Sequence, residues 1–196
     1  MQARKSVLLP LWRAVGHDGE LEDAVGSVAA LLGRAMPVER LELLRCEPRA
    51  RRFETAAATG RPATAPKAWQ CTVNDWQTLA GEATGGAVLA VDDDNACLPA
   101  LRPLALQGLG GGRLVGVLRE GDGPLLGLAV IEASKPYSAQ HRSDFAALLE
   151  PLATLLARDA RRRALDRERA AAQAELQSLR GHLGRERSWM ARATTS

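Results

Sequence analysis

Three cysteines are the residues of this sequence best suited to chemistry. Cys46, Cys71 and Cys97 are odd in number and widely spaced, a pattern that indicates neither a disulfide framework nor a zinc site. A cysteine thiolate can ligate iron or haem, attach a chromophore or undergo redox chemistry. The alternative is that each thiol is a small buried hydrophobe. For Cys71 and Cys97 the sequence leaves both interpretations open.

Two other motifs raise the possibility of a bound ion. Asp92, Asp93 and Asp94 offer the oxygen ligands that a hard cation prefers. Three contiguous carboxylates rarely point at one ion, so a solvated turn is favoured, although one of them could contact a ligand. The glycine-rich run from Gly108 to Gly112 lacks the Lys-Ser/Thr ending of a phosphate loop and precedes a strand. It indicates a flexible turn into a sheet.

No catalytic set is apparent. His17, His141 and His182 are far apart, and neither a Ser–His–Asp grouping nor a metal-ligand spacing is present. We therefore predict no catalytic residue, no metal site and no enzyme activity, and the sequence identifies no cofactor. A net charge of +3 is too small to indicate direct nucleic-acid binding. No apolar run approaches the ~20 residues of a membrane span, and the thiols are typical of a cytoplasmic protein.

Hydrophobic periodicity predicts the elements that position these residues. Runs of strand length predict a central antiparallel sheet of five or six strands, at 38–46, 53–59, 69–73, 87–91, 113–119 and 125–133. Helical spacing predicts helices at 4–15, 18–36, 75–83, 97–106 and from Ser138 onward. We place Asp18 at the second helix's N-cap, expect the strand at 87–91 to be buried, and expect Pro151 to bend the last helix. The fold class is α+β, with helices from both ends of the chain on one face of the sheet and irregular segments on the other.

Residues 158–196 predict a helical linker with a short coiled coil. Leu165, Ala172 and Leu179 fall at one heptad position, and Leu176 and Leu183 at the other. A monomer would leave this apolar stripe in water, so these five residues are predicted to form a homodimer interface. The alternative is a solvated helix that frays.

Residues 18–157 resemble a GAF domain, the small-molecule sensor module of many bacterial regulators, phosphodiesterases and phytochromes, preceded by an N-terminal helix at 1–17. The pattern is diffuse and comprises Val88–Asp94, Leu98–Leu106, Leu114–Leu118, Leu125–Ala133, Lys135, Tyr137 and the helix from Ser138. Cyclic-nucleotide-binding members carry an Asp-Glu pair three residues after the position of Tyr137, where this chain has His141-Arg142. That departure argues against cyclic nucleotides. The chain also resembles neither bilin-attaching nor methionine sulfoxide-reducing members.

The resemblance implies a cytoplasmic sensory module that binds a small effector. A dimeric helix would relay the signal to an output domain absent from this sequence, in cis or in a partner regulator. That output would be a transcription activator ATPase, a histidine kinase or a cyclase; a ligand-free dimerisation domain is the alternative. We expect a pocket between the sheet and residues 90–106, because a short, proline-rich cover packs less completely than a long helix. The predicted ligand contacts are Val91, Asp93, Cys97, Leu98, Leu101, Leu106, Val115 and Val117, with Cys71 and Trp76 as further candidates.

Overall fold

A computed structural model describes residues 20–60, 67–82, 87–91, 98–104, 111–121 and 123–193 of the chain. Side chains are described in these ranges up to residue 180, except at positions 82 and 90. The predicted helix at 4–15 lies outside the described residues. The chain divides into two compact units, residues 1–157 and 158–196.

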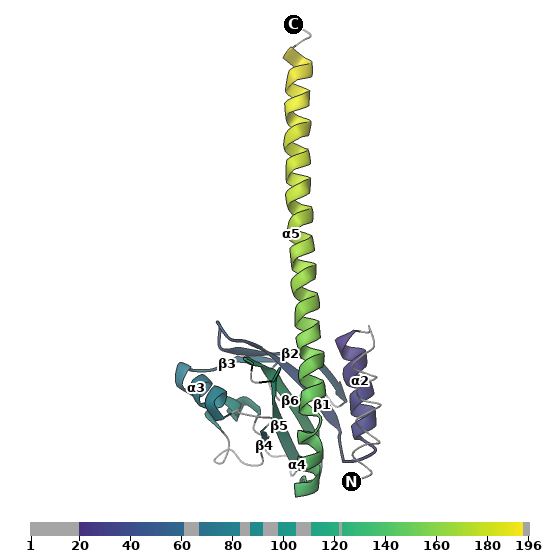
Figure 1. Cartoon of the computed structure of the whole chain (residues 1–196), viewed down its shortest axis with the longest axis vertical. Coiled ribbons are helices and arrows are strands. Elements are labelled where there is room, and N and C mark those ends of the chain that lie inside the picture. The colour runs from purple at the N-terminus through teal and green to yellow at the C-terminus, as the bar shows by residue number, and fades with distance from the viewer. Residues whose placement is uncertain are drawn as a thin grey trace. The chain divides into compact units, whose positions relative to one another are not determined.

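The first unit is built on a six-stranded antiparallel sheet of order β3-β2-β1-β6-β5-β4 (Figure 1). The strands are β1 (Arg40–Glu47), β2 (Arg52–Gly60), β3 (Ala68–Gln70), β4 (Val88–Ala90), β5 (Gly112–Arg119) and β6 (Leu125–Ala133). The predicted antiparallel sheet is confirmed. The prediction of a buried strand at 87–91 is wrong, because β4 is an edge strand in which Val88 and Leu89 are only half-buried.

Within the described ranges, four α-helices and one 3-10 helix accompany the sheet. They are α2 (Leu21–Leu32), α3 (Val73–Glu82), η1 (Pro99–Leu104), α4 (Ala139–Ala146) and α5 (Leu149–Ala193). The N-cap of α2 is Glu20, which makes no side-chain capping bond, so the prediction that Asp18 caps this helix is wrong. The helix predicted at 97–106 is a single 3-10 segment, because Pro99 and Pro103 each remove a backbone donor.

The helix predicted from Ser138 is two helices. Ser138 caps α4, and its Oγ accepts a hydrogen bond from the backbone N–H of His141 at 3.2 Å. The chain turns at Ala147 and Leu148, and α5 begins at Leu149. Pro151 therefore lies in the first turn of α5, where its missing N–H removes no intrahelical bond. The predicted bend is replaced by a helix boundary just before the proline.

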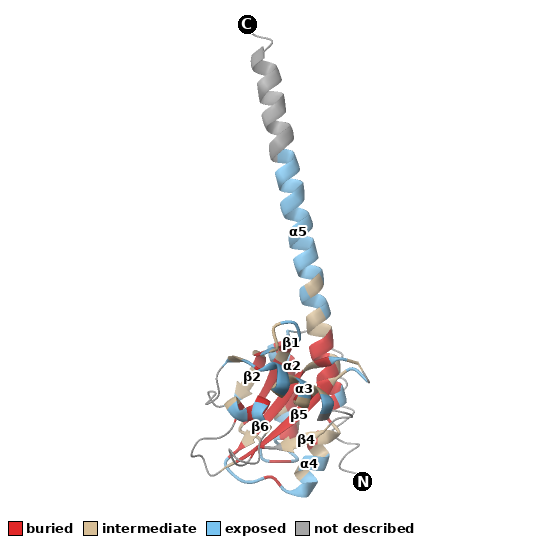
Figure 2. Cartoon of the chain, turned by 90° about the vertical axis from the view of Figure 1, so that its left-hand side faces the viewer, coloured by how far each residue is buried: buried red, intermediate tan, exposed pale blue. Residues whose placement is uncertain are grey.

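The two faces of the sheet carry separate hydrophobic cores. On the face that we call the helix face, α2, α4 and the start of α5 cover Leu41, Leu43, Leu114, Leu118, Ala129 and Ile131. On the opposite side, the cover face, α3 and η1 cover Leu44, Cys46, Phe53, Val115, Val117, Leu128 and Val130. Figure 2 shows the central strands β1, β5 and β6 mostly in the red of buried residues. Alternation along each strand sends successive side chains to opposite cores.

Close approach on the helix face depends on two glycines. A methyl group at Gly116 would overlap the side chain of Leu149, and one at Gly127 would overlap the backbone of Leu44 and the side chain of Leu156. Glycine at these positions lets the start of α5 lie directly against β5 and β6. The helix face is therefore packed without spare volume at these contacts.

The second unit, from Arg158, is the remainder of α5. Its described side chains are mostly exposed, and they include an ion pair of 3.0 Å between Asp159 and Arg163, one helical turn apart. Nowhere in the described part of the chain is a helix both long enough and apolar enough to cross a membrane.

Candidate functional site

The predicted ligand contacts that the structure describes gather in the core of the cover face. Cys71, Val91, Leu101, Val115 and Val117 are buried there, and the half-buried Leu98 and Trp76 pack against them. Asp93, Cys97 and Leu106 lie outside the described residues. Segments far apart in sequence are thus brought together over one side of β5 and β6. Contact with a ligand remains a prediction for each of these residues.

The 3-10 helix η1 is attached at the carbonyl oxygen of Ala100, which accepts from Trp69 and, at the longer distance of 3.9 Å, from the thiol of Cys71. The indole Nε1 of Trp69, on β3, donates a hydrogen bond of 3.1 Å to the carbonyl oxygen of Ala100. In a 3-10 helix that carbonyl would accept from residue 103, but residue 103 is a proline without an N–H. Trp69 supplies the bond that Pro103 cannot. It thereby holds η1 with Leu101 and Leu104 fully buried against the sheet.

An aromatic cluster joins the strands of this edge to α3. The ring of Phe53 is fully buried, with ring centroids 5.2 Å from Trp69 and 5.6 Å from Trp76, both tilted. Such offset contacts add about 0.5–1.5 kcal/mol each beyond area burial. Because Trp76 lies on α3 and Trp69 on β3, Phe53 is the point where both pack on β2.

The helix α3 is fixed at both ends by side-chain bonds. At its start, Thr72 Oγ1 accepts from the N–H of Asp75 at 3.1 Å. Near its end, Arg119 Nη2 donates to the carbonyl oxygen of Ala80 at 2.5 Å. The same guanidinium donates from Nη1 to the carbonyl oxygen of Gly123 at 3.0 Å, in the β5–β6 turn. A cation at the last carbonyls of a helix also opposes the negative end of the helix dipole.

The two described thiols are buried beneath this cover. Burial raises the pKa of Cys46 to about 12, against a smaller lowering by Arg119. Cys46 Sγ lies 3.0 Å from the carbonyl oxygen of Leu125, to which it donates. Burial likewise raises the pKa of Cys71. Both thiols are therefore protonated at neutral pH, which favours the interpretation of Cys71 as a small hydrophobe over a reactive group.

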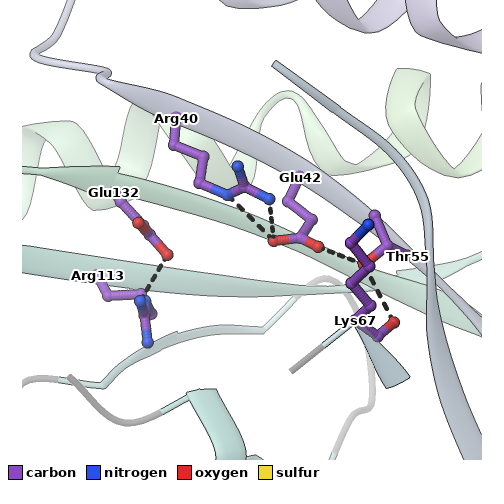
Figure 3. A network of polar contacts seen from close by, with 6 residues as sticks. All are labelled: Arg40, Glu42, Thr55, Lys67, Arg113 and Glu132. Carbon is purple, nitrogen blue, oxygen red and sulfur yellow. Dashed lines mark hydrogen bonds and ion pairs between the residues drawn. The ribbon is translucent and has the colours of Figure 1, made fainter. Parts of the chain in front are cut away.

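A row of buried charged residues continues the cover face beyond the apolar core, and the sequence reasoning missed it. We call it the polar row: Arg113 on β5, Glu132 on β6, Arg40 and Glu42 on β1, and Thr55 on β2 (Figure 3). Arg113 has no exposed surface, and Arg40 and Glu42 are 6% and 3% exposed. Charges at such depth are tolerated only where partners compensate for lost hydration.

Those partners come from a neighbouring strand or, for Arg40 and Glu42, from the same strand. Arg113 Nη2 lies 2.5 Å from Glu132 Oε1, and the two residues are directly opposite in the β5–β6 register. Arg40 contacts Glu42 Oε2 through Nε at 3.2 Å and Nη2 at 2.9 Å. The Thr55 hydroxyl lies 2.6 Å from Glu42 Oε1 and 3.1 Å from the carbonyl oxygen of Lys67. Figure 3 shows two groups whose members point toward one another, Arg113 with Glu132, and Arg40 with Glu42, Thr55 and Lys67.

Strand parity was the signal that could have revealed the polar row. Arg113 precedes Val115 by two residues, and Glu132 follows Val130 by two, so each charged residue shares a face with a buried valine. The row also adjoins the predicted pocket segment, because the N–H of Val91 donates to the carbonyl oxygen of Arg113 at 3.0 Å. The cover face therefore combines a large apolar area with a few fixed charged groups, the composition typical of small-molecule sites.

The predicted dimer interface is only partly described, and no metal site was predicted. Within the described ranges, no three His, Cys, Asp or Glu side chains are grouped so as to hold a metal ion; the triplet at 92–94 lies outside them. On α5, Leu165, Leu176 and Leu179 are 54%, 54% and 55% exposed, and Ala172 is exposed too. The side chain of Leu183 is outside the described residues.

Known proteins resemble this chain in structure but not in sequence. No protein-family model matches the sequence, and a search of curated proteins finds no match either. Among solved structures, the GAF domain of a phosphoenolpyruvate-protein phosphotransferase from Coxiella burnetii is similar, with a TM-score of 0.58 and 19% identity, covering 84% of this chain and 97% of that one. The phycocyanobilin-bound GAF domain of a cyanobacterial phytochrome has a TM-score of 0.54 and 18% identity, covering 79% and 94%.

A third similar structure is an enzyme. Free methionine-R-sulfoxide reductase from Neisseria meningitidis, in complex with its substrate, has a TM-score of 0.59 and 17% identity, covering 84% of this chain and 94% of that one. At such identities the likeness concerns the fold alone. The six-stranded antiparallel sheet, its flanking helices and the long C-terminal helix agree with these structures over most of their lengths, and this chain has the GAF fold.

Proposed function

We propose that this protein is a sensory input module that binds a small effector on the cover face of its sheet. The observation that carries the proposal is the polar row beside an apolar core, beneath a cover made of two short elements. Apolar contacts would provide affinity, and the buried charges would provide orientation and selectivity. Two similar structures, the phycocyanobilin-bound domain and the substrate-bound reductase, illustrate that this fold accepts small molecules in other proteins.

A matched pair of variants tests this function. Leu98 and Leu31 are both half-buried leucines, Leu98 against the cover-face core and Leu31 against the helix-face core. Native mass spectrometry of protein purified from its own host should reveal a bound small molecule. Leu98→Trp should reduce its occupancy at least tenfold by filling space at the cover, whereas Leu31→Trp should not. Equal occupancy in both variants, or none in the wild-type protein, would contradict the proposal.

The relay is proposed to run through α5 in a homodimer. The exposed stripe at Leu165, Ala172, Leu176 and Leu179 supports a second copy as its partner, because a leucine seam at heptad spacing is buried by pairing. Light scattering should give twice the monomer mass at tens of micromolar, and Leu176→Asp should give a monomer. A wild-type protein that stays monomeric at that concentration would refute this arrangement.

The receiver of the signal is proposed to be an output domain in cis or a partner regulator in the cytoplasm, acting in transcription or another signalling process. The competing function is a ligand-free dimerisation domain. It predicts a stable dimer with no bound molecule and no response to Leu98→Trp. A catalytic role is not proposed, and wild-type protein should show no turnover of free methionine sulfoxide.

A further inference from the structure

The two cover elements differ in how firmly they are held. The 3-10 helix η1 buries Ala100, Leu101 and Leu104 within six residues. In α3, with ten residues, Leu79 alone of the described side chains is buried. Trp76 is half-buried and Val73 is 53% exposed. Because hydrophobic stabilisation scales with the apolar area removed from water, α3 gains less per residue from packing than η1 does.

Arg119 compensates for this weak packing. Its guanidinium holds the carbonyl oxygen of Ala80 near the end of α3 and that of Gly123 in the β5–β6 turn. These two carbonyls come from segments about 40 residues apart, and Ala80 is 39 residues from Arg119 itself. A single side chain thus joins the C-terminal end of α3 to the hairpin, while Thr72 caps the N-terminal end of the helix.

We propose that α3 is a hinged cover over the Phe53–Cys46 side of the apolar core, and that Arg119 is the latch that keeps it closed. When the two carbonyl bonds break, α3 swings away at its C-terminal end and exposes the aromatic cluster and both thiols. The opening admits small uncharged molecules to the cover face. This role in admission rests on the proposed effector site, whereas the latch itself does not.

The buried cysteines report the opening directly. Cys46 and Cys71 belong to the core beneath α3, and an uncharged maleimide reacts only with an accessible thiolate. Loss of Arg119 removes an influence that lowers the pKa of Cys46, so in a closed protein it would slow the reaction. Faster labelling without Arg119 must therefore come from greater exposure.

The test is the rate of labelling of the full chain by N-ethylmaleimide, resolved by peptide mass spectrometry so that Cys97 is scored separately. In Arg119→Gln, Cys46 and Cys71 should react about 10- to 100-fold faster, because a hydrogen bond from a charged donor changes an opening equilibrium by about that factor. Arg119→Lys, which keeps the charge but loses the two-carbonyl geometry, should be intermediate. Amide exchange should accelerate in Val73–Glu82 and stay unchanged in β5 and β6.

Arg45→Gln is the matched control. Arg45 is next to Cys46 on β1, so its side chain lies on the other face of the sheet, where its Nη1 pairs with Glu54 Oε1 at 3.3 Å. The substitution therefore removes a comparable cation from that face. Unchanged labelling in Arg119→Gln, equal acceleration in Arg45→Gln, or exchange that rises together in α3 and the central strands would overturn the latch. If Arg119→Gln does not fold, the labelling rates of Cys46 and Cys71 in Arg119→Lys are compared with those of the wild-type protein instead. No effector is needed, so failure here is distinguishable from failure of the proposed function.

Discussion

The two faces of the sheet are covered in different ways, although both bury an apolar core. The helix face is closed by α2, α4 and the start of α5, whose contacts in the core are apolar, and glycine at positions 116 and 127 leaves room for α5 to lie against the strands. The cover face is closed by two short elements, each fastened by a side chain that reaches a backbone carbonyl, Trp69 for η1 and Arg119 for α3. The helix face is held by close apolar packing, whereas each covering element of the cover face is also held by its own side-chain hydrogen bond.

Charge sharpens the contrast. Arg40, Glu42 and Arg113 are the buried charged residues of the described chain, and all three lie on the cover face. A buried ion pair is seldom the most stable choice, since apolar residues of similar volume are often as stabilising or more so. The buried charges of the cover face therefore need not add to the stability of the fold.

The largest effect should come from breaking the polar row on one side only. Glu132→Leu leaves the Arg113 guanidinium buried without the carboxylate opposite it, and the loss should be about 3–5 kcal/mol of unfolding free energy. The double variant Arg113→Met with Glu132→Leu should recover most of that loss, because no charge remains at the pair. Urea unfolding measures both. A double variant as unstable as the single one would show that the row stabilises the fold after all.

Replacing one buried leucine by alanine on each face should then show whether the two faces differ in their contribution to global stability. Leu152 on the helix face and Leu79 on the cover face are both fully buried. Leu152→Ala should cost about 2–5 kcal/mol, the usual range for a core leucine. Leu79→Ala should cost less in global unfolding, because its penalty is limited to the free energy with which α3 is docked. Equal losses in urea unfolding would mean that α3 unfolds only with the whole domain.

A smaller effect is expected at the attachment of η1. Trp69→Phe keeps an aromatic ring against Phe53 but removes the indole donor to the carbonyl oxygen of Ala100. The substitution should lower the free energy that holds η1 in place by about 1–3 kcal/mol. The loss should appear as faster amide exchange in η1. Trp76→Phe is the control, because it is the other tryptophan packed on Phe53 and lies on α3 instead of β3. Equal effects on η1 in both variants would assign the attachment to ring packing.

The sequence predicted the helix face better than the cover face for a physical reason. Periodicity reports burial of apolar side chains, and on the helix face burial is the whole mechanism: Leu114, Leu118, Ile131 and the leucines of α5 were all visible as stripes. The break between α4 and α5 is the exception. The apolar stripe predicts one continuous helix through Pro151, whereas this proline lies in the first turn of α5.

On the cover face the determining contacts cross long stretches of sequence. Nothing local to Arg119 predicts that its partner is the carbonyl oxygen of Ala80, and nothing local to Trp69 predicts Ala100. The free carbonyl of Ala100 could have been inferred from Pro103, but its partner could not. The polar row was accessible in principle through strand parity, yet charged residues in strands are ordinarily assigned to the solvent side, and only the sheet order shows that both sides are covered.

The smallest expected effect is a loss of stability in alkali that comes from one thiol of the cover face. Burial raises the pKa of Cys46 to about 12 from the ordinary value of 9.0, so the folded state holds a proton that the unfolded state releases above about pH 9. With fewer protons bound when unfolded, stability falls as pH rises, by at most about 1.4 kcal/mol per pH unit between these two pKa values. Below pH 8 the thiol has no such effect.

Urea unfolding at pH 7.5 and pH 9.5 should therefore show a loss of just under about 1 kcal/mol that Cys46→Ala removes. The upper limit of pH 9.5 keeps the contribution of Tyr137 small, because that pH lies below the ordinary pKa of 10.0 at which the phenol ionises in the unfolded chain, and burial raises the pKa further in the folded state. Cys71→Ala, whose thiol is raised in the same direction, measures the share of the second cysteine. A pH dependence that persists when both thiols are replaced would place the titrating group outside the cover face.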